Sequence, residues 1–290
     1  MRLRRIRELG AEVLLTYFQQ HLARAAAGLS YFLTLSFFPM LILLYQMLGS
    51  FLPPVEQLRA FLTGVLPESA AEIIEDFLGY VSENLDSSML AMALSALVTS
   101  SSAAFRCIDN VTAEMRGSTR YSGFLELLFS AVFALVFLAA LYLAVILTVT
   151  GKWFLELLDR RIMFMNLSDS WSWARFVLLF VLLFAMLLWL YRMTAPRGGG
   201  RAAVMLPGAV LASLAIVGVS VAFSAMISVN VSYPVVYGSL ASLMILMLWL
   251  YLCGVIILLG IALNVALERR CGAAARRKLP VCRPGPGRRI

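Results

Sequence analysis

Long apolar stretches separated by short polar segments dominate the pattern of this chain. The clearest are two runs near the carboxyl end, each longer than 20 residues and free of charged residues, which flank a break at 230–238. A bilayer core needs about 20 apolar residues per helix, so these runs predict a transmembrane hairpin. Further apolar stretches come earlier in the chain. We therefore expect an all-α polytopic membrane protein with six transmembrane helices, at residues 25–51, 88–107, 124–150, 174–191, 201–229 and 239–267.

Amphipathic segments lie outside these spans. Residues 1–24 predict a cytoplasmic amphipathic N-terminal helix, which lies along the membrane surface or serves as a simple lead-in helix. Residues 52–87, between spans one and two, hold seven acidic residues against the single Arg59. They predict amphipathic helices that form an extracytoplasmic cap. The six-span membrane domain then covers 25–267, and a basic, disordered tail is expected at 268–290.

Composition supports this class. The chain is 61% hydrophobic and 14% charged, whereas a soluble domain carries roughly 25% charged residues. Too little polar surface remains for a water-soluble globular domain. The chain also lacks alternating segments of about 10 residues, which excludes an outer-membrane barrel. The four cysteines lack the paired short spacing of a zinc site and are interpreted as free thiols.

The distribution of charge predicts the orientation. The net charge is +8, and most of the 24 Lys and Arg residues fall in the two terminal segments and in the loops on their side. The positive-inside rule then places both termini in the cytoplasm. Anionic lipids of the inner leaflet are the expected partners of the basic termini, and the charge needs no nucleic acid to explain it. A homo-oligomer remains open.

The second predicted span carries polar residues spaced by four, three, four and three positions, which places them on one helical face. Polar groups that face lipid are costly, so this face should line the bundle interior or water. Two interpretations remain: packing between helices, or a path for a substrate. The residues of this candidate polar path are Ser95, Thr99, Ser102, Arg106 and Asp109.

Proline and glycine residues predict kinks and turns. Pro39 lies within the first span, and Pro207 with Gly208 lies at the entry to the fifth. Kinked helices beside a polar face suit a cavity at mid-membrane. The hairpin break supplies interfacial anchors or an outer mouth, and its candidate residues are Tyr233, Tyr237 and Gly238.

Several of these positions resemble a known family. The first span, RAAAGLSYFLTLSFFPMLILL, contains Tyr31 and Pro39 and is similar to the opening span of the YihY/BrkB family of bacterial inner-membrane proteins. The fifth span opens with LPGA, which resembles the family's ALPGA entry. The segment SYPVVYGSL resembles its hairpin turn, and span six ends in the expected Leu-Asn pair at Asn264. One departure is Ala262, where many members carry an acidic residue.

The resemblance implies a multi-pass protein of the bacterial plasma membrane without an established biochemical activity. Some members carry the label ribonuclease BN and others the label virulence factor BrkB. The residues argue against an enzyme, because the single His21 excludes a paired-histidine site and no Gly-rich phosphate loop occurs. No catalytic residue, metal or cofactor is expected.

Three functional hypotheses follow. The first is a transporter or permease-like protein for a small or lipid-like substrate, with an anionic group if Arg106 lines the path. An envelope scaffold or interaction protein is the alternative, and a membrane-bound ribonuclease is the remote one.

Overall fold

The computed structural model describes residues 2–48, 79–81, 86–117, 128–140, 142–144, 171–195, 202–229 and 240–278, and its elements there are helices. Five helices are long and apolar enough to cross a membrane, which confirms an all-α protein of the membrane class. These candidate spans are Leu22–Gln46, Ser87–Arg116, Phe176–Met193, Val204–Met226 and Leu243–Arg270. A shorter apolar helix, Leu128–Ala144, includes one undescribed residue.

The longer helices follow one another along the chain. They are α1 (Arg2–Gln19), α2 (Leu22–Leu48), α5 (Ser87–Arg116), α7 (Trp171–Met193), α8 (Ala202–Val229) and α10 (Leu240–Lys278). Asp86 begins α5 because its carboxylate accepts the backbone N–H of Met89 at 2.7 Å. Gly117 ends it in the left-handed conformation, with φ of 72°.

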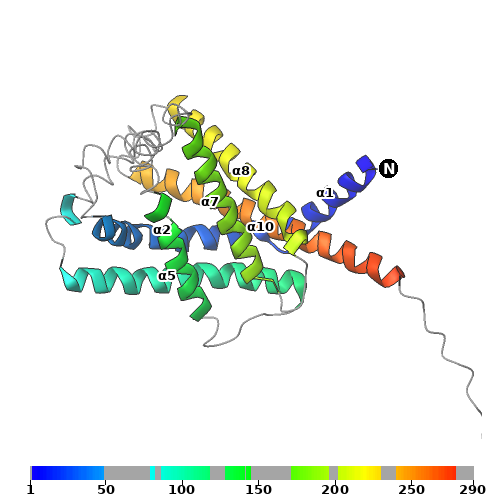
Figure 1. The fold of residues 1–290 in the computed structure, drawn as a ribbon, viewed down its shortest axis with the longest axis horizontal. Coiled ribbons are helices and arrows are strands. Elements are labelled where there is room, and N and C mark those ends of the chain that lie inside the picture. Colours follow the sequence, from blue (N-terminus) through cyan, green and yellow to red (C-terminus); the bar gives the residue numbers. More distant parts are fainter. Residues whose placement is uncertain are drawn as a thin grey trace, which may run out of the picture.

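Three long helices run side by side and form the centre of the molecule. In Figure 1, α2, α5 and α10 lie along the horizontal axis, and α7 and α8 cross them steeply. Contacts at the start of α2 set its direction: Ala25 accepts a hydrogen bond from Cys107 near the end of α5, and Ala26 packs on Gly254 of α10. The shared core therefore draws buried residues from α2, α5, α7, α8 and α10.

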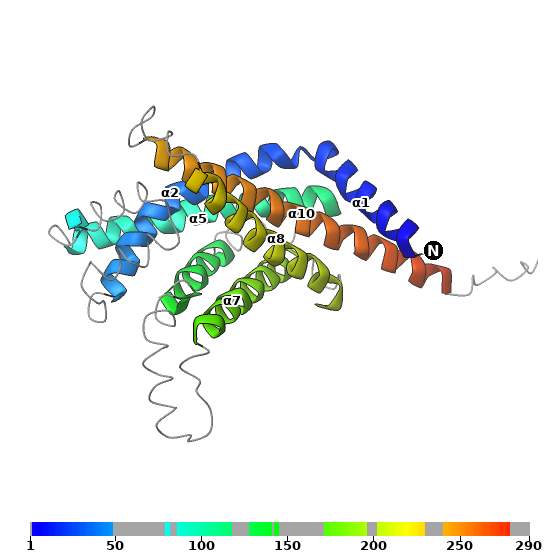
Figure 2. The same cartoon turned by 90° about the horizontal axis from the view of Figure 1, so that it is seen from above.

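The first helix is joined to the second through a sharp break. His21 has a φ of 48°, in the left-handed region, and its carbonyl oxygen accepts the backbone N–H of Arg24 at 2.9 Å. Before the break, Glu12 pairs with Arg270 at 2.9 Å. Because Ala26 packs on Gly254, the α1–α2 segment runs antiparallel to the last part of α10, and Figure 2 shows the two side by side.

Proline affects two helices differently. Pro39 lies inside α2, where it removes one backbone donor. The second half of α2 turns away from the direction of its first half in Figure 2. Pro207 lies inside α8 near its start. Neither proline ends its helix, so both segments still serve as candidate spans.

Two helices extend further than the apolar pattern alone predicts. The apolar pattern ends span two at Cys107, but α5 continues to Arg116, so Arg106 and Arg116 lie on the helix and not in a following loop. The α10 helix likewise continues past Leu267 to Lys278. In α5 the charged residues end the apolar stretch but not the helix. The helix ends where Gly117 caps it in the left-handed conformation.

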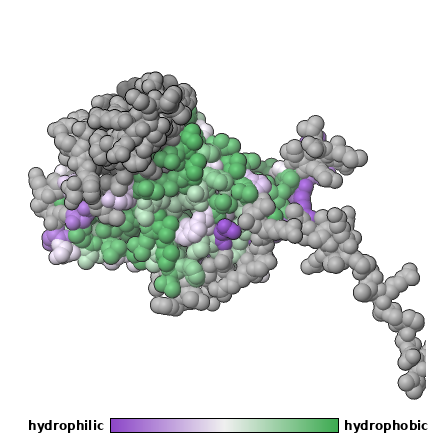
Figure 3. Space-filling model, in the orientation of Figure 1, coloured by the Kyte–Doolittle hydropathy of each residue, from purple (hydrophilic) through white to green (hydrophobic). Residues whose placement is uncertain are grey.

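Most of the outer surface of the helices is apolar. Figure 3 shows a broad hydrophobic surface over the described helices, with few hydrophilic residues between. Large exposed side chains such as Val177, Leu211 and Val221 lie on α7 and α8. Such a belt suits contact with lipid acyl chains. Of the predicted acidic cap at 52–87, the structure describes only residues 79–81, 86 and 87, and the hairpin turn with Tyr233, Tyr237 and Gly238 lies outside the described residues.

Candidate functional site

The predicted polar face of α5 lies along the boundary between exposed and buried surface. Ser95 and Thr99 are exposed, and each hydroxyl donates to a carbonyl of its own helix at 2.9 Å. Arg106 is exposed as well. Ser102 and Asp109 are buried, with 3% and 4% of their surface accessible. The five residues share a helical face, and the structure divides them between its open and its packed side.

A neighbouring helix covers the packed side of this face. Ser130, on the 128–140 helix, donates its hydroxyl to the Ser102 hydroxyl oxygen at 2.8 Å, and both residues are buried. One turn later Phe133 contacts Phe105 of α5 and stacks on Trp189 of α7, with ring centroids 5.7 Å and 5.4 Å apart. The 128–140 helix thus lies between α5 and α7. Ser130 was not predicted from the sequence, since nothing near it in the chain marks it.

Arg106 lies within the candidate span Ser87–Arg116, after the uncharged part of α5. Ten residues separate it from Arg116, which corresponds to about 15 Å of helix. Arg116 contacts Glu268, the first charged residue after the apolar part of α10, so this pair marks one edge of the apolar region. Asp109 and Glu114 follow Arg106 on α5, so Arg106 is the first charged residue of this candidate span. Ionisable residues within a membrane-spanning helix are costly and commonly mark functional paths.

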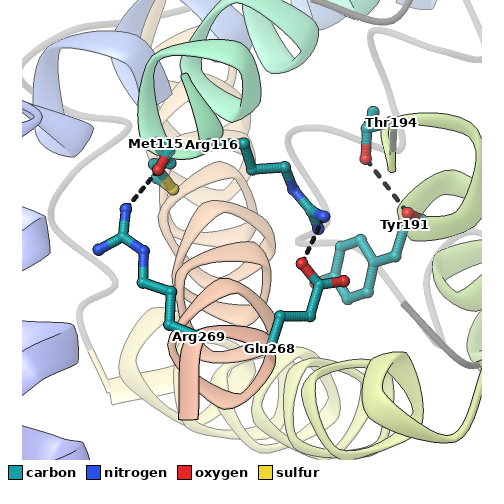
Figure 4. A network of polar contacts seen from close by, with 6 residues as sticks. All are labelled: Met115, Arg116, Tyr191, Thr194, Glu268 and Arg269. Carbon is teal, nitrogen blue, oxygen red and sulfur yellow. Dashed lines mark hydrogen bonds and ion pairs between the residues drawn. The ribbon is translucent and has the colours of Figure 1, made fainter. Parts of the chain in front are cut away.

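The same face of α5 ends at a largely buried ion pair. Arg116 comes seven residues after Asp109, which returns it to the same side of the helix. Its Nη1 atom lies 2.6 Å from Glu268 Oε2, and the two side chains are 7% and 19% exposed. Figure 4 shows Arg116 reaching from α5 to Glu268 on α10. Neither residue of this pair was singled out from the sequence.

A second arginine secures the same helix end. Arg269 donates to the Met115 carbonyl, one of the α5 carbonyls that lack a partner within the helix (Figure 4). The next residue, Arg270, pairs with Glu12 of α1, with both side chains about one-third exposed, at 34% and 32%. Three consecutive residues of α10 therefore tie it to α5 and α1.

Several buried polar atoms in this region have no hydrogen-bond partner within the described residues. They are Arg116 Nε, Glu268 Oε1 and Asn264 Nδ2. Asn264 precedes Glu268 by four residues on α10, so both lie on one face of that helix. Buried polar groups are usually paired, so these atoms mark a place where a polar group fits.

Two of the residues that carry the family resemblance contact each other. Asn264 Oδ1 accepts the Gly208 backbone N–H at 3.0 Å, which joins α10 to α8. Pro207 is exposed beside this contact, and Ala262 is buried in the core. Tyr31 lies on α2 with 51% of its surface exposed. The structure thus brings Gly208 and Asn264 together, at a contact between α8 and α10 and not on the α5 polar face.

Metal chemistry has no candidate in this region. Among the residues that the structure describes, no three His, Cys, Asp or Glu side chains gather as metal ligands would. Cys107 and Cys253 are free thiols. Cys107 is half-buried and donates to the Ala25 carbonyl at 3.3 Å, so it has a packing role.

Comparison with known proteins places these features in context. The family model for virulence factor BrkB matches residues 13–281. A curated relative, the putative ribonuclease-like protein YfkH of Bacillus subtilis (strain 168), is 27% identical over 251 residues, which cover 84% of this chain and 90% of the relative. No solved structure matches the chain. The matched region runs from within α1 to beyond the end of α10, so it includes the α5 polar face and the Arg116–Glu268 pair.

Proposed function

This chain belongs to the virulence factor BrkB family, and we propose that it acts as a permease-like membrane protein for a small or lipid-like substrate that carries an anionic group. The observation that carries the proposal is Arg106. Its side chain is exposed within a candidate span, at the first charged position of α5, on the face that also presents Ser95 and Thr99. A guanidinium on a membrane-spanning helix favours an anionic group that passes along the face.

Hydroxyl groups along the same face support a path. Ser95 and Thr99 satisfy their own donors within the helix, so their oxygen atoms add polarity without requiring a fixed partner. Ser102 and Asp109 line the packed edge, where Ser130 contributes a further hydroxyl. A polar face beside apolar walls lowers the cost of moving a charged headgroup or a small anion past the acyl chains.

Topology is part of the proposal. We assign six spans, with the helix at 128–144 as the third, and both termini to the cytoplasm of a bacterial cell. The charge distribution supports this assignment, since the basic terminal segments contain much of the positive charge. Tags placed at either terminus should resist added protease in intact spheroplasts, and a tag at residues 151–170 should be cut. Termini on opposite sides of the membrane would contradict the six-span arrangement.

The function is tested by flux from reconstituted vesicles. Purified protein in phospholipid vesicles is supplied in turn with labelled carboxylates, labelled phosphate esters and a fluorescent short-chain phosphatidylglycerol. We expect flux above that of empty vesicles for at least one class, a large loss in Arg106→Gln, and partial recovery in Arg106→Lys. Arg24→Gln, an exposed arginine at the start of α2, is the matched control. No flux for any class, or unchanged flux in Arg106→Gln, contradicts the proposal.

Ribonuclease chemistry is not part of this proposal, although the printed name of the relative includes it. The one histidine of the chain, His21, lies at the α1–α2 break and is exposed. Acid–base cleavage of RNA needs a second positioned acid, base or metal. We expect purified protein to leave a labelled RNA intact with and without Mg²⁺; cleavage that follows the protein through size-exclusion chromatography would overturn this.

A further inference from the structure

The cytoplasmic end of the α5 polar face holds a second guanidinium. We infer that Arg116 is a further anion-binding residue of this path, and that Glu268 occupies it when no substrate is present. The inference rests on the proposed function, because it assigns a role at the end of the same path. The ligand class is an anionic group, either a carboxylate or a phosphate.

Helical spacing places Arg116 at the packed edge of the face that presents Arg106, about 80° around the helix from it. From Arg106 this edge is reached at Asp109 and again at Arg116, with separations of three and seven residues. The two arginines are therefore separated by about 15 Å along the helix axis. An anion that leaves Arg106 towards the cytoplasm meets Arg116 as the next cation described on that face.

The contact with Glu268 engages only part of the Arg116 guanidinium. Its Nη1 atom lies 2.6 Å from Glu268 Oε2, whereas Arg116 Nε and Glu268 Oε1 have no hydrogen-bond partner in the described part of the chain. A guanidinium binds a carboxylate best through two parallel N–H donors. The pair is therefore incompletely engaged, and Arg116 retains a buried donor suited to a further anionic oxygen.

Burial and the neighbouring charges favour an anion at Arg116. Its side chain is only 7% exposed, so its charge is weakly screened. The adjacent cations on α10 are engaged elsewhere, Arg269 with the Met115 carbonyl and Arg270 with Glu12. Glu268 lies in front of the Tyr191 ring in Figure 4. When a substrate anion binds, it takes the place of the Glu268 carboxylate on Arg116, so the guanidinium keeps one anionic partner.

Charge-selective labelling of a nearby cysteine tests this assignment. Ala113 is half-buried and precedes Arg116 by one turn on the same face, so Ala113→Cys reports on that site. The background protein carries serine at Cys107, Cys271 and Cys282 and alanine at Cys253. Two thiol reagents of similar size are compared from the cytoplasmic side, the anionic sulfonatoethyl and the cationic trimethylammonioethyl methanethiosulfonates.

The variants Glu268→Gln and Arg116→Gln should favour thiol reagents of opposite charge. In Glu268→Gln the anionic reagent should react at least about tenfold faster than in the parent, and the cationic reagent should gain much less, because Arg116 is left uncompensated. In Arg116→Gln the preference should reverse. Inorganic phosphate should slow the anionic reagent in Glu268→Gln and have little effect in Arg116→Gln.

The Glu12–Arg270 pair is the matched control, because it also ties α10 to a neighbour but lies off the polar face. Glu12→Gln should leave both labelling rates unchanged. If the single variants do not fold, the exchanged pair Arg116→Glu with Glu268→Arg should fold and label slowly with both reagents, and phosphate should not change either rate.

The outcomes separate this inference from the proposed function. Equal gains for both reagents in Glu268→Gln, or equal gains in Glu12→Gln, overturn the anion site at Arg116. Charge-selective labelling without flux for any substrate class supports the site and contradicts transport. Flux that survives in Arg116→Gln with unchanged rate and apparent affinity removes Arg116 from the path and leaves the Arg106 proposal standing.

Discussion

The backbone N–H of Gly208 donates to the side-chain oxygen of Asn264 at 3.0 Å and so joins α8 to α10. Asn264 is 1% exposed, and its side-chain atoms lie so close to Gly208 that a methyl group there would overlap them. The donor comes from the residue after Pro207, in a turn where proline already disrupts the helix ladder. The Pro-Gly pair therefore opens the backbone of α8 to the asparagine of the last helix.

Substitution of this glycine should destabilise the helix pair. In Gly208→Ala the new methyl group displaces Asn264, and we expect a loss of about 1–3 kcal/mol in the free energy of unfolding. Gly218→Ala on the same helix is the control, because a methyl group there meets nothing within 4 Å. That variant should gain up to about 1 kcal/mol from helix propensity. Unfolding of both variants in mixed micelles compares them, and equal stabilities would rule out the contact.

A glycine on α10, Gly260, should be energetically coupled to Tyr191 on α7. A methyl group on Gly260 would overlap the Tyr191 hydroxyl, which donates to the Ile257 carbonyl at 3.0 Å. Tyr191→Phe alone should cost about 1 kcal/mol through the lost hydrogen bond. Gly260→Ala should cost more, but the double variant should cost less than the sum by about 1 kcal/mol, because the clashing oxygen is gone. Additive losses would show that the two residues do not interact.

The two ion pairs of α10 should differ in their contribution to stability. Arg116 and Glu268 are 7% and 19% exposed, whereas Arg270 and Glu12 are 34% and 32% exposed. Glu268→Gln should therefore lower the free energy of unfolding by about 3 kcal/mol, since it leaves a buried cation uncompensated. Glu12→Gln should cost less than about 1 kcal/mol. Chemical unfolding at low and high salt measures both, and the reverse order would contradict the assigned burial.

The start of α5 should respond to acid. Hydrogen bonds from the Met89 N–H and the Ser88 hydroxyl hold the pKa of the Asp86 carboxyl below its ordinary value. The cap is therefore fully stabilising above that ordinary value and is lost as the pH falls through the lowered pKa of the folded state. The melting temperature of the native protein should fall more than that of Asp86→Asn between about pH 6 and about pH 3. Parallel curves for the two proteins would show that Asp86 does not titrate with folding.

Much of the fold follows from local pattern. Long charge-free stretches predict membrane-spanning helices in any surroundings, because every backbone polar group in lipid must be paired within the segment. The i, i+3 and i+4 spacing of the α5 residues likewise places them on one face without knowledge of the neighbours. Helix ends were less predictable: α5 passes Cys107 and stops at the Gly117 cap, and α10 passes Leu267.

The residues that contact the candidate site from other helices could not be predicted from the sequence. Ser102 meets Ser130 on another helix, and Arg116 meets Glu268 although 152 residues separate them along the chain. Glu268 also follows the apolar stretch closely enough to resemble the beginning of a solvated tail. Only its burial and its contact with Arg116 distinguish it from an ordinary surface charge.

The sequence by itself determined that the chain is an all-helical membrane protein with a polar face on one span, because hydrophobicity and helical periodicity are properties of a single segment. Only the tertiary structure decided which side of that face is packed, where Asn264 finds its partner, and that the face ends at a buried ion pair. Those features depend on the relative placement of two or more helices. The physical reason is that desolvation and hydrogen-bond distance are set by both partners at once.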